Sequence, residues 1–278
     1  MQITKAVITA AGKDQTHLPL QTVVDHSGNS GNALELVLDE ITSAGIDDIA
    51  IIVSPGQAER YQAAAGQHAS RLVFFPQDNP KGYGDAILRA KEFTGNDAFL
   101  HLVSDHLYVS HGKTSCAAQL IEVAKRESCS VSAIQPTRES KLIYYGAVGG
   151  VPVPQNPNLY QVSTVLEKPT PTVAEQSLIV AGQRSGHYLC LFGMHVLTPG
   201  IMNLLQAQVA ACENGKVNLS DSLNQLAQQE RYLAFKVNGE RYNIGEKYGL
   251  LIAQMAIALS GPDRDRILVE TIELLAKH

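Results

Sequence analysis

Short apolar runs alternate with amphipathic segments along the first half of the chain. Leu34, Val37, Leu38 and Ile41 recur at i, i+3, i+4 and i+7, which predicts a helix with one buried face. The neighbouring apolar runs are short and rich in β-branched residues, as strands are. The pattern predicts strands at residues 3–9, 49–53, 72–75 and 98–103, and helices at residues 33–44, 57–67 and 85–92. This alternation is typical of an α/β fold with a mostly parallel sheet flanked by helices.

The pattern changes after about residue 141, where Pro and Gly clusters separate the apolar runs. Here we expect strands at residues 145–151, 160–167 and 188–194, and helices at residues 199–211 and 219–229. Asn238-Gly239 lies between two further strand-like runs, residues 232–237 and 241–244. Asn-Gly between two such runs is a strong signal for a tight hairpin, so we predict that these two strands pair.

The tail, residues 246–278, predicts two helices divided near Gly261-Pro262. No repeat, low-complexity segment or linker interrupts the sequence before it. We therefore expect one domain over residues 1–278, with residues 246–278 as a C-terminal helical appendage.

Composition and charge limit the classes of partner that the protein can bind. The chain has 278 residues, with 22 Lys and Arg against 27 Asp and Glu, for a net charge of −5. No basic field is available to bind nucleic acid by counterion release. No apolar run approaches the roughly 20 residues that cross a bilayer. The four cysteines are far apart in sequence and form no metal-binding pair. We expect a cytoplasmic protein that binds neither nucleic acid nor a membrane.

Candidate chemistry lies where the predicted strands end, because ligands of open α/β sheets bind at the carboxyl ends of the strands. Ala10-Ala11-Gly12 follows the first strand, and a turn of such small residues lets backbone amides approach a phosphate. Gly82 and Gly84 also allow close approach, although their loop lacks the third glycine of a dinucleotide fingerprint. A simple helix-capping turn is the alternative for that second loop.

Two further sites carry charge. Asp105 ends the apolar strand that precedes it, where a carboxylate can hold Mg²⁺ together with substrate phosphates. Its alternative is a helix or turn cap. Glu167-Lys168 offers an acceptor for sugar hydroxyls beside a cation for phosphate, and its alternative is a surface ion pair.

Six short motifs occur in the order KAVITAAG, PKGYGDAILRA, HLVSD, YYGAV, VLEKP and YNIGEKYG. In this order they resemble the sugar-1-phosphate nucleotidylyltransferases, in particular the bacterial-type UTP:glucose-1-phosphate uridylyltransferases, or UDP-glucose pyrophosphorylases. The resemblance runs from Lys5 to about Ala256. It implies a Rossmann-like nucleotidyltransferase fold that uses Mg²⁺. It also implies that the protein joins a nucleoside triphosphate to a sugar 1-phosphate, giving a nucleotide sugar and pyrophosphate.

The resemblance also implies roles for individual residues. Asp105 and Lys168 would be catalytic, Asp105 by binding the metal and Lys168 by contacting the sugar phosphate. Gly146 and Glu167 would bind the sugar with Lys168. The nucleotide would lie against Ala10, Ala11, Gly12, Gln77 and Gly82. Members of the family form dimers or tetramers, so we expect a homo-oligomer, with the helices after residue 246 available for that contact.

Three departures from the family pattern fall at positions that would bind the triphosphate or the metal. The first loop of the family reads AAGxGTR, but here Gly12 is followed by Lys13-Asp14-Gln15-Thr16, which makes the phosphate loop degenerate. The lysine of the family's PKxMLP motif has no counterpart. Instead, residues 26–32 form a Gly- and Asn-rich loop that could be a substitute anion-binding turn or a plain surface loop. The family's second metal-binding aspartate is Asn243 here, so its metal role is doubtful.

These observations leave more than one function open. We favour a nucleotidylyltransferase because Asp105 and Lys168 are both present. The main alternative is a catalytically impaired relative that binds nucleotide sugar or regulates an active paralogue. A glycosyltransferase is a weaker alternative, because a single acid stands where a DxD motif would be needed. A dehydrogenase lacks its dinucleotide fingerprint.

Overall fold

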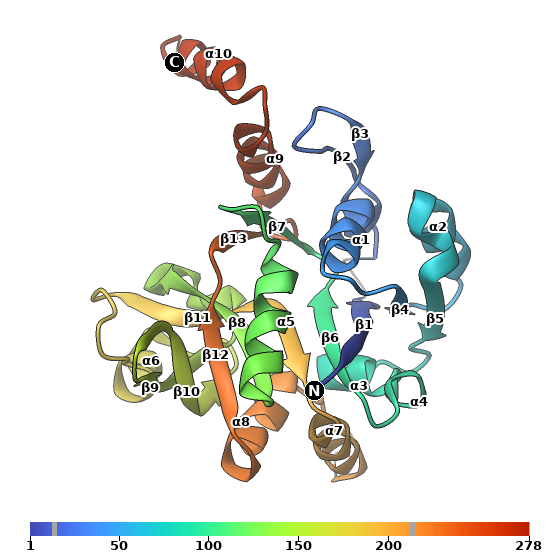
Figure 1. Cartoon of the computed structure of the whole chain (residues 1–278), viewed down its shortest axis with the longest axis vertical. Helices are drawn as coiled ribbons and strands as arrows, with labels where there is room; N and C mark the ends of the chain where they lie inside the picture. The colour runs from blue at the N-terminus through green and yellow to red at the C-terminus, as the bar shows by residue number, and fades with distance from the viewer. Residues whose placement is uncertain (13–15, 212–214, 278) are drawn as a thin grey trace.

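A nine-stranded sheet forms the centre of the molecule (Figure 1). The computed structural model describes residues 1–12, 16–211 and 215–277. In its first half, four parallel strands lie in the order β5-β4-β1-β6. They are β1 (Ile3–Ala10), β4 (Asp48–Val53), β5 (Leu72–Pro76) and β6 (Ala98–Val103). The strands predicted for this half are therefore confirmed.

The second half of the sheet is mixed. Strand β11 pairs antiparallel with both β6 and β8, whereas β12 is parallel to β8. Strand β10 is antiparallel to β12 and β9. Only β10 and β11 run against the other described strands of this sheet, so it is mixed but mostly parallel, as predicted. The new strands are β8 (Ser130–Arg138), β9 (Ala147–Val153), β10 (Asn156–Leu166), β11 (His187–Leu197) and β12 (Tyr232–Lys236).

Helices cover both faces of the sheet because consecutive strand residues point to opposite sides. Ile8 joins a core cluster with residues of α1 and α5, and its neighbour Val7 joins a second cluster with residues of α3, α7 and α8. The helices are α1 (Ala33–Ser43), α2 (Ala58–Ala64), α3 (Tyr83–Leu88), α4 (Lys91–Thr94), α5 (Cys116–Glu127), α6 (Pro171–Ser177), α7 (Gly200–Ala211) and α8 (Leu219–Gln229). Short 3₁₀ turns cover Leu18–Leu20, Gly66–Arg71 and Glu139–Tyr144.

The hairpin predicted at Asn238-Gly239 is wrong. Strand β12 lies between β8 and β10 and has no free edge, so β13 (Gly239–Asn243) cannot pair with it. Strand β13 instead pairs antiparallel with β7 (His106–Ser110), away from the main sheet. Gly239 is required there, since a Cβ atom would lie 2.6 Å from Cys116 Sγ. The connection therefore carries the chain from the centre of the sheet to the end of β6.

A small hairpin and two helices lie at the other end of the molecule. Strands β2 (Thr22–Val24) and β3 (Ser30–Asn32) pair, and Gln254 of α9 exchanges two hydrogen bonds with the backbone of Val24. Helices α9 (Gly249–Ser260) and α10 (Arg264–Leu275) form an arm that projects from the body (Figure 1). None of the described helices is long and apolar enough to span a membrane.

Candidate active site

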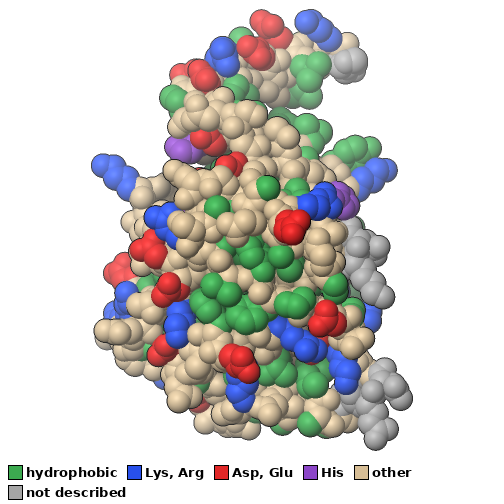
Figure 2. All heavy atoms as spheres, turned by 90° about the vertical axis from the view of Figure 1, so that its right-hand side faces the viewer, with side chains coloured by type: hydrophobic (Ala, Val, Ile, Leu, Met, Phe, Trp, Pro, Cys, Tyr) green, Lys and Arg blue, Asp and Glu red, His purple; other side chains and the backbone are tan. Residues whose placement is uncertain are grey.

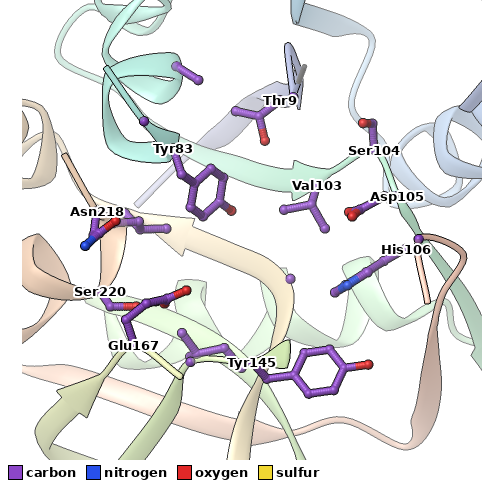
Figure 3. A pocket seen from close by; sticks show the side chains of 18 of the residues that line it. Thr9, Tyr83, Val103, Ser104, Asp105, His106, Tyr145, Glu167, Asn218 and Ser220 are labelled. Atoms are coloured by element: carbon purple, nitrogen blue, oxygen red, sulfur yellow. The ribbon is translucent and has the colours of Figure 1, made fainter. Parts of the chain in front are cut away.

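One cavity of about 750 Å³ gathers the ten residues to which the family pattern gives a role or a doubtful role. It opens where β1 and β6 end, next to the start of α3 and the loops before β9 and after β10 (Figure 3). Its lining includes Ala10, Ala11, Gly12, Gln77, Gly82, Asp105, Gly146, Glu167, Lys168 and Asn243. The structure therefore brings these residues together in one cavity, whereas their individual roles remain predictions.

The wall formed by the loop before α3 is held by a buried carboxylate. The Gln77 side-chain amide donates to Asp85 Oδ2 over 2.7 Å and to the Gly82 carbonyl over 3.2 Å. Asp85 is 1% exposed and also accepts from Arg89 over 3.0 Å. These bonds use the donor end of Gln77 and leave its carbonyl oxygen for a ligand.

Gly82 is required by both its backbone angle and its surroundings. Its φ is +112°, which L side chains rarely adopt, and a Cβ atom would lie 2.7 Å from the Val217 carbonyl oxygen. The segment around Val217 is bonded to this loop from both sides. Gly84 N–H donates to Val217 over 2.9 Å, and Val217 N–H donates to Lys81 over 2.6 Å. No motif in the sequence marks this segment, although Lys216, Asn218 and Ser220 all line the cavity.

The opposite wall combines a carboxylate with a point of close approach. Glu167 Oε2 accepts from the Ser220 hydroxyl over 2.6 Å, and Gly146 lies beside both. A Cβ atom on Gly146 would lie 3.1 Å from each of these two oxygens. Lys168 follows with a φ of +43° and an exposed ammonium 4.0 Å from Glu167 Oε1. This cation is therefore free to contact a ligand.

A third part of the cavity lies where β13 meets the end of β6. Ile244 N–H donates to the Asp105 carbonyl over 2.9 Å, which brings Asn243 next to Asp105. Asn243 Oδ1 accepts from Gly245 N–H over 2.8 Å. The other acid on this side, Glu246, is paired with Lys141 and accepts from the Tyr145 hydroxyl. Among the described residues, no three His, Cys, Asp or Glu side chains form a complete metal site.

The floor of the cavity contains polar residues that sequence analysis did not identify. Thr9 and Tyr83 both reach His101, which faces His195 across β6 and β11. Burial lowers the pKa of His195 to about 3, and the nearby His106 adds to the decrease. Burial also raises the pKa of Tyr83 well above 10, with the charges of Asp105 and Glu167 contributing. The floor therefore presents neutral hydroxyl and imidazole groups.

The structure bears on only part of the degenerate phosphate loop. Lys13, Asp14 and Gln15 lie outside the described residues. The loop at residues 26–32 does not line the cavity. Its amides at Ser27 and Asn29 donate to Asp25, and Glu35 accepts from Asn32 N–H at the start of α1. These three amides are already used, so they are not available to bind a phosphate.

Comparison with known proteins identifies the family and its relatives. The family model described as nucleotidyl transferase matches residues 22–259. A UTP–glucose-1-phosphate uridylyltransferase of Streptococcus pneumoniae is 26% identical over 296 residues, covering 94% of this chain and 92% of its own. A Streptococcus pyogenes protein of the same name is 27% identical, with 94% and 90% covered.

Solved structures show the same fold. A UDP-glucose pyrophosphorylase complexed with UDP-glucose superimposes with a TM-score of 0.73, at 23% identity over 92% of this chain and 98% of its own. A UTP-bound enzyme from Acinetobacter baumannii gives a TM-score of 0.73 at 22% identity, covering 98% of this chain and 99% of its own. At these identities the similarity establishes the fold.

Proposed function

The chain belongs to the nucleotidyl transferase family, and from this we propose that it joins UTP to glucose 1-phosphate, giving UDP-glucose and pyrophosphate. The observation that carries the proposal is that the residues expected to bind base, sugar and metal all line one cavity. Its volume of about 750 Å³ suits a ligand of nucleotide-sugar size. The more general form of the proposal is transfer from a nucleoside triphosphate to a sugar 1-phosphate.

The wall at Gln77 and Gly82 is our proposed nucleotide site. The free carbonyl oxygen of Gln77 can accept from a base N–H, while Gly82 lets Val217 pack directly against this wall and hold it in place. Ala10, Ala11 and Gly12 line the adjacent end of β1 and leave room for the ribose and phosphates. A hydrogen-bonding site of this kind discriminates between bases because an unmatched buried polar group is costly.

The wall at Gly146, Glu167 and Lys168 is our proposed sugar site. Ser220 fixes the Glu167 carboxylate, which can then accept from sugar hydroxyls. Gly146 lets the sugar reach this carboxylate without a clash. The exposed Lys168 ammonium then binds the sugar phosphate and holds its oxygen for attack on the α-phosphorus of the triphosphate. Attack breaks the bond to the bridging oxygen, and pyrophosphate leaves with that electron pair.

Asp105 and Asn243 suit a divalent cation whose remaining coordination positions are filled by substrate phosphates. Asp105 supplies one carboxylate and Asn243 one neutral oxygen, and Mg²⁺ is commonly held by one or two carboxylates plus phosphates. When bound, Mg²⁺ would neutralise charge on the reacting phosphates. The protein's own groups perform the remaining work, which is to position two anionic substrates against each other.

We also propose a homo-oligomer, either a dimer or a tetramer, in the cytoplasm, where nucleoside triphosphates are available. The appendage at residues 246–278 extends a single catalytic domain and presents apolar side chains for this contact. No nucleic acid or membrane is expected to take part, since the net charge is −5.

Steady-state kinetics of pyrophosphate release tests the two walls separately. Lys168→Met is expected to raise the KM for glucose 1-phosphate about tenfold or more with little change in the KM for UTP. Gln77→Ala is expected to do the reverse. Lys113→Ala removes an exposed lysine outside the cavity and serves as the control. If both variants raised the two KM values equally, the assignment of separate base and sugar walls would be wrong.

A further inference from the structure

His106 is a histidine within the metal corner that the proposed function does not use. It is 7% exposed and lines the cavity directly after Asp105. Its Nδ1 lies 3.2 Å from the Phe192 carbonyl oxygen, which can only accept, so Nδ1 carries the proton. In this tautomer Nε2 has a free lone pair. No described group is bonded to Nε2, and Figure 3 shows the ring pointing into the cavity.

Three ligand atoms converge on this corner. Asp105 and His106 both point into it (Figure 3). Asn243 stands directly opposite His106 in the antiparallel pair formed by β7 and β13. Side chains of directly opposed residues project from the same face, with Cβ atoms about 5 Å apart. A carboxylate, an imidazole nitrogen and an amide oxygen therefore face one volume.

Three acceptors face this corner, and among the described residues none of them is paired with a cation. Within the described residues, the Asp105 carboxylate accepts no hydrogen bond and forms no ion pair. Lys141 is paired with Glu246 instead. The Arg241 guanidinium lies behind the corner, stacked 3.7 Å from the centre of the Tyr145 ring. A bound cation would satisfy the Asp105 carboxylate and His106 Nε2, and would share the Asn243 oxygen with Gly245 N–H.

We propose that His106 is a metal ligand, so that Asp105, His106 and Asn243 together bind a divalent transition-metal ion whose remaining positions are filled by substrate phosphates. The inference rests on the proposed function for the phosphates but not for the three protein ligands.

The nitrogen ligand changes which metal the corner prefers. An imidazole suits borderline ions such as Co²⁺ and Zn²⁺, whereas Mg²⁺ is bound through oxygen. His106→Ala should therefore weaken Co²⁺ binding about tenfold or more and change Mg²⁺ binding much less. His111→Ala is the matched control, because His111 follows the same strand but its side chain is 53% exposed outside the cavity.

Pulsed EPR of the full chain loaded with Mn²⁺, with and without UTP, tests the ligand directly. We expect coupling to a histidine nitrogen that changes on ¹⁵N-histidine labelling, disappears in His106→Ala and persists in His111→Ala. His106→Gln, which keeps most of the side-chain volume, should also lose the coupling and guards against misfolding of the alanine variant.

The spectra of the wild type and of His106→Ala can each overturn the inference. Absence of histidine coupling in the loaded wild type, or coupling that persists without His106, would show that His106 is not a ligand. These outcomes are distinct from failure of the proposed function. A protein that releases pyrophosphate without histidine coupling is a transferase with an oxygen-only metal site, and coupling without pyrophosphate release supports the metal site alone.

Discussion

At the scale of single residues, the cavity depends on its glycines as much as on the side chains that line it. Gly146 lies where the side chains of Leu191, Glu167 and Ser220 meet, with no space for a Cβ atom at ordinary contact distance. Gly82 is similarly enclosed by Val217. Both glycines were identified from their motifs, but their neighbours come from elements far away in the sequence. Ser220 and Val217 carried no recognisable signal, because their importance arises from packing across the cavity.

Gly146→Ala is predicted to impair sugar binding more than nucleotide binding. The added methyl group would lie about 3.1 Å from both Glu167 Oε2 and Ser220 Oγ, which must shift to accommodate it. We expect the KM for glucose 1-phosphate to rise about tenfold while the KM for UTP changes little. Gly112→Ala, at an exposed glycine beyond the end of β7, provides the control in the same kinetic assay. An unchanged KM for the sugar phosphate would remove Gly146 from the proposed sugar site.

At the scale of elements, periodicity predicted most of the strands and helices, but it missed α5 and β8 and did not show how the later strands pair. The parallel order β5-β4-β1-β6 follows from alternating strands and helices, whose crossovers leave few arrangements. The failed hairpin shows the limit of this reasoning. Asn238-Gly239 favours a turn locally, yet β12 was already enclosed by β8 and β10. This redirection is what brings Asn243 to Asp105, so the missed feature helps to form the site.

The cross-strand pair of His101 and His195 predicts a stability that falls with acid. Burial lowers the pKa of His195 to about 3 in the folded protein, below the ordinary histidine value of 6.5, so the unfolded chain takes up a proton first as the pH falls. The contribution of the neutral His195 ring to the free energy of unfolding is complete above about pH 6.5 and is lost progressively below it. The free energy of unfolding should be about 2 kcal/mol lower at pH 5 than at pH 7.5, because His195 stays neutral in the folded protein.

Urea unfolding at pH 7.5 and pH 5 measures this cost. His195→Asn should show a smaller decrease in the free energy of unfolding between the two pH values than the wild type does. His111→Asn, which removes an exposed histidine, should behave like the wild type. Equal pH dependence in the wild type and His195→Asn would show that this pair does not stay neutral in the folded protein.

At the scale of the whole molecule, the arm exposes apolar side chains to solvent, which is unfavourable for a single chain. No residue of α10 is buried, and Val269, Ile272 and Leu275 are each more than half exposed. Figure 2 shows the arm above the body, with hydrophobic side chains beside its charged ones. A 12-residue helix has little stability on its own in water. Contact with a second copy would bury these side chains and stabilise the helix.

Sedimentation of the full chain is therefore predicted to give a dimer or a tetramer. Val269→Glu combined with Ile272→Glu should shift the protein towards the monomer, because a buried unpaired charge is costly at an apolar contact. Thr271→Glu adds one charge to the same helix and shows whether charge on α10 is enough by itself. A wild-type protein that sediments as a monomer would contradict the proposed oligomer.

The central claim is that the cavity transfers a uridylyl group, and the fate of the α-phosphorus tests it most directly. The protein is incubated with UTP labelled at the α-phosphorus, glucose 1-phosphate and Mg²⁺, beside Asp105→Asn and, as a control for charge removal, Asp265→Asn in the exposed arm. We predict that the label appears in UDP-glucose for the wild type and Asp265→Asn, and is greatly reduced for Asp105→Asn. Label that stays in UTP, in a protein that still binds UDP-glucose, would contradict the claim and identify a nucleotide-sugar-binding relative without transferase activity.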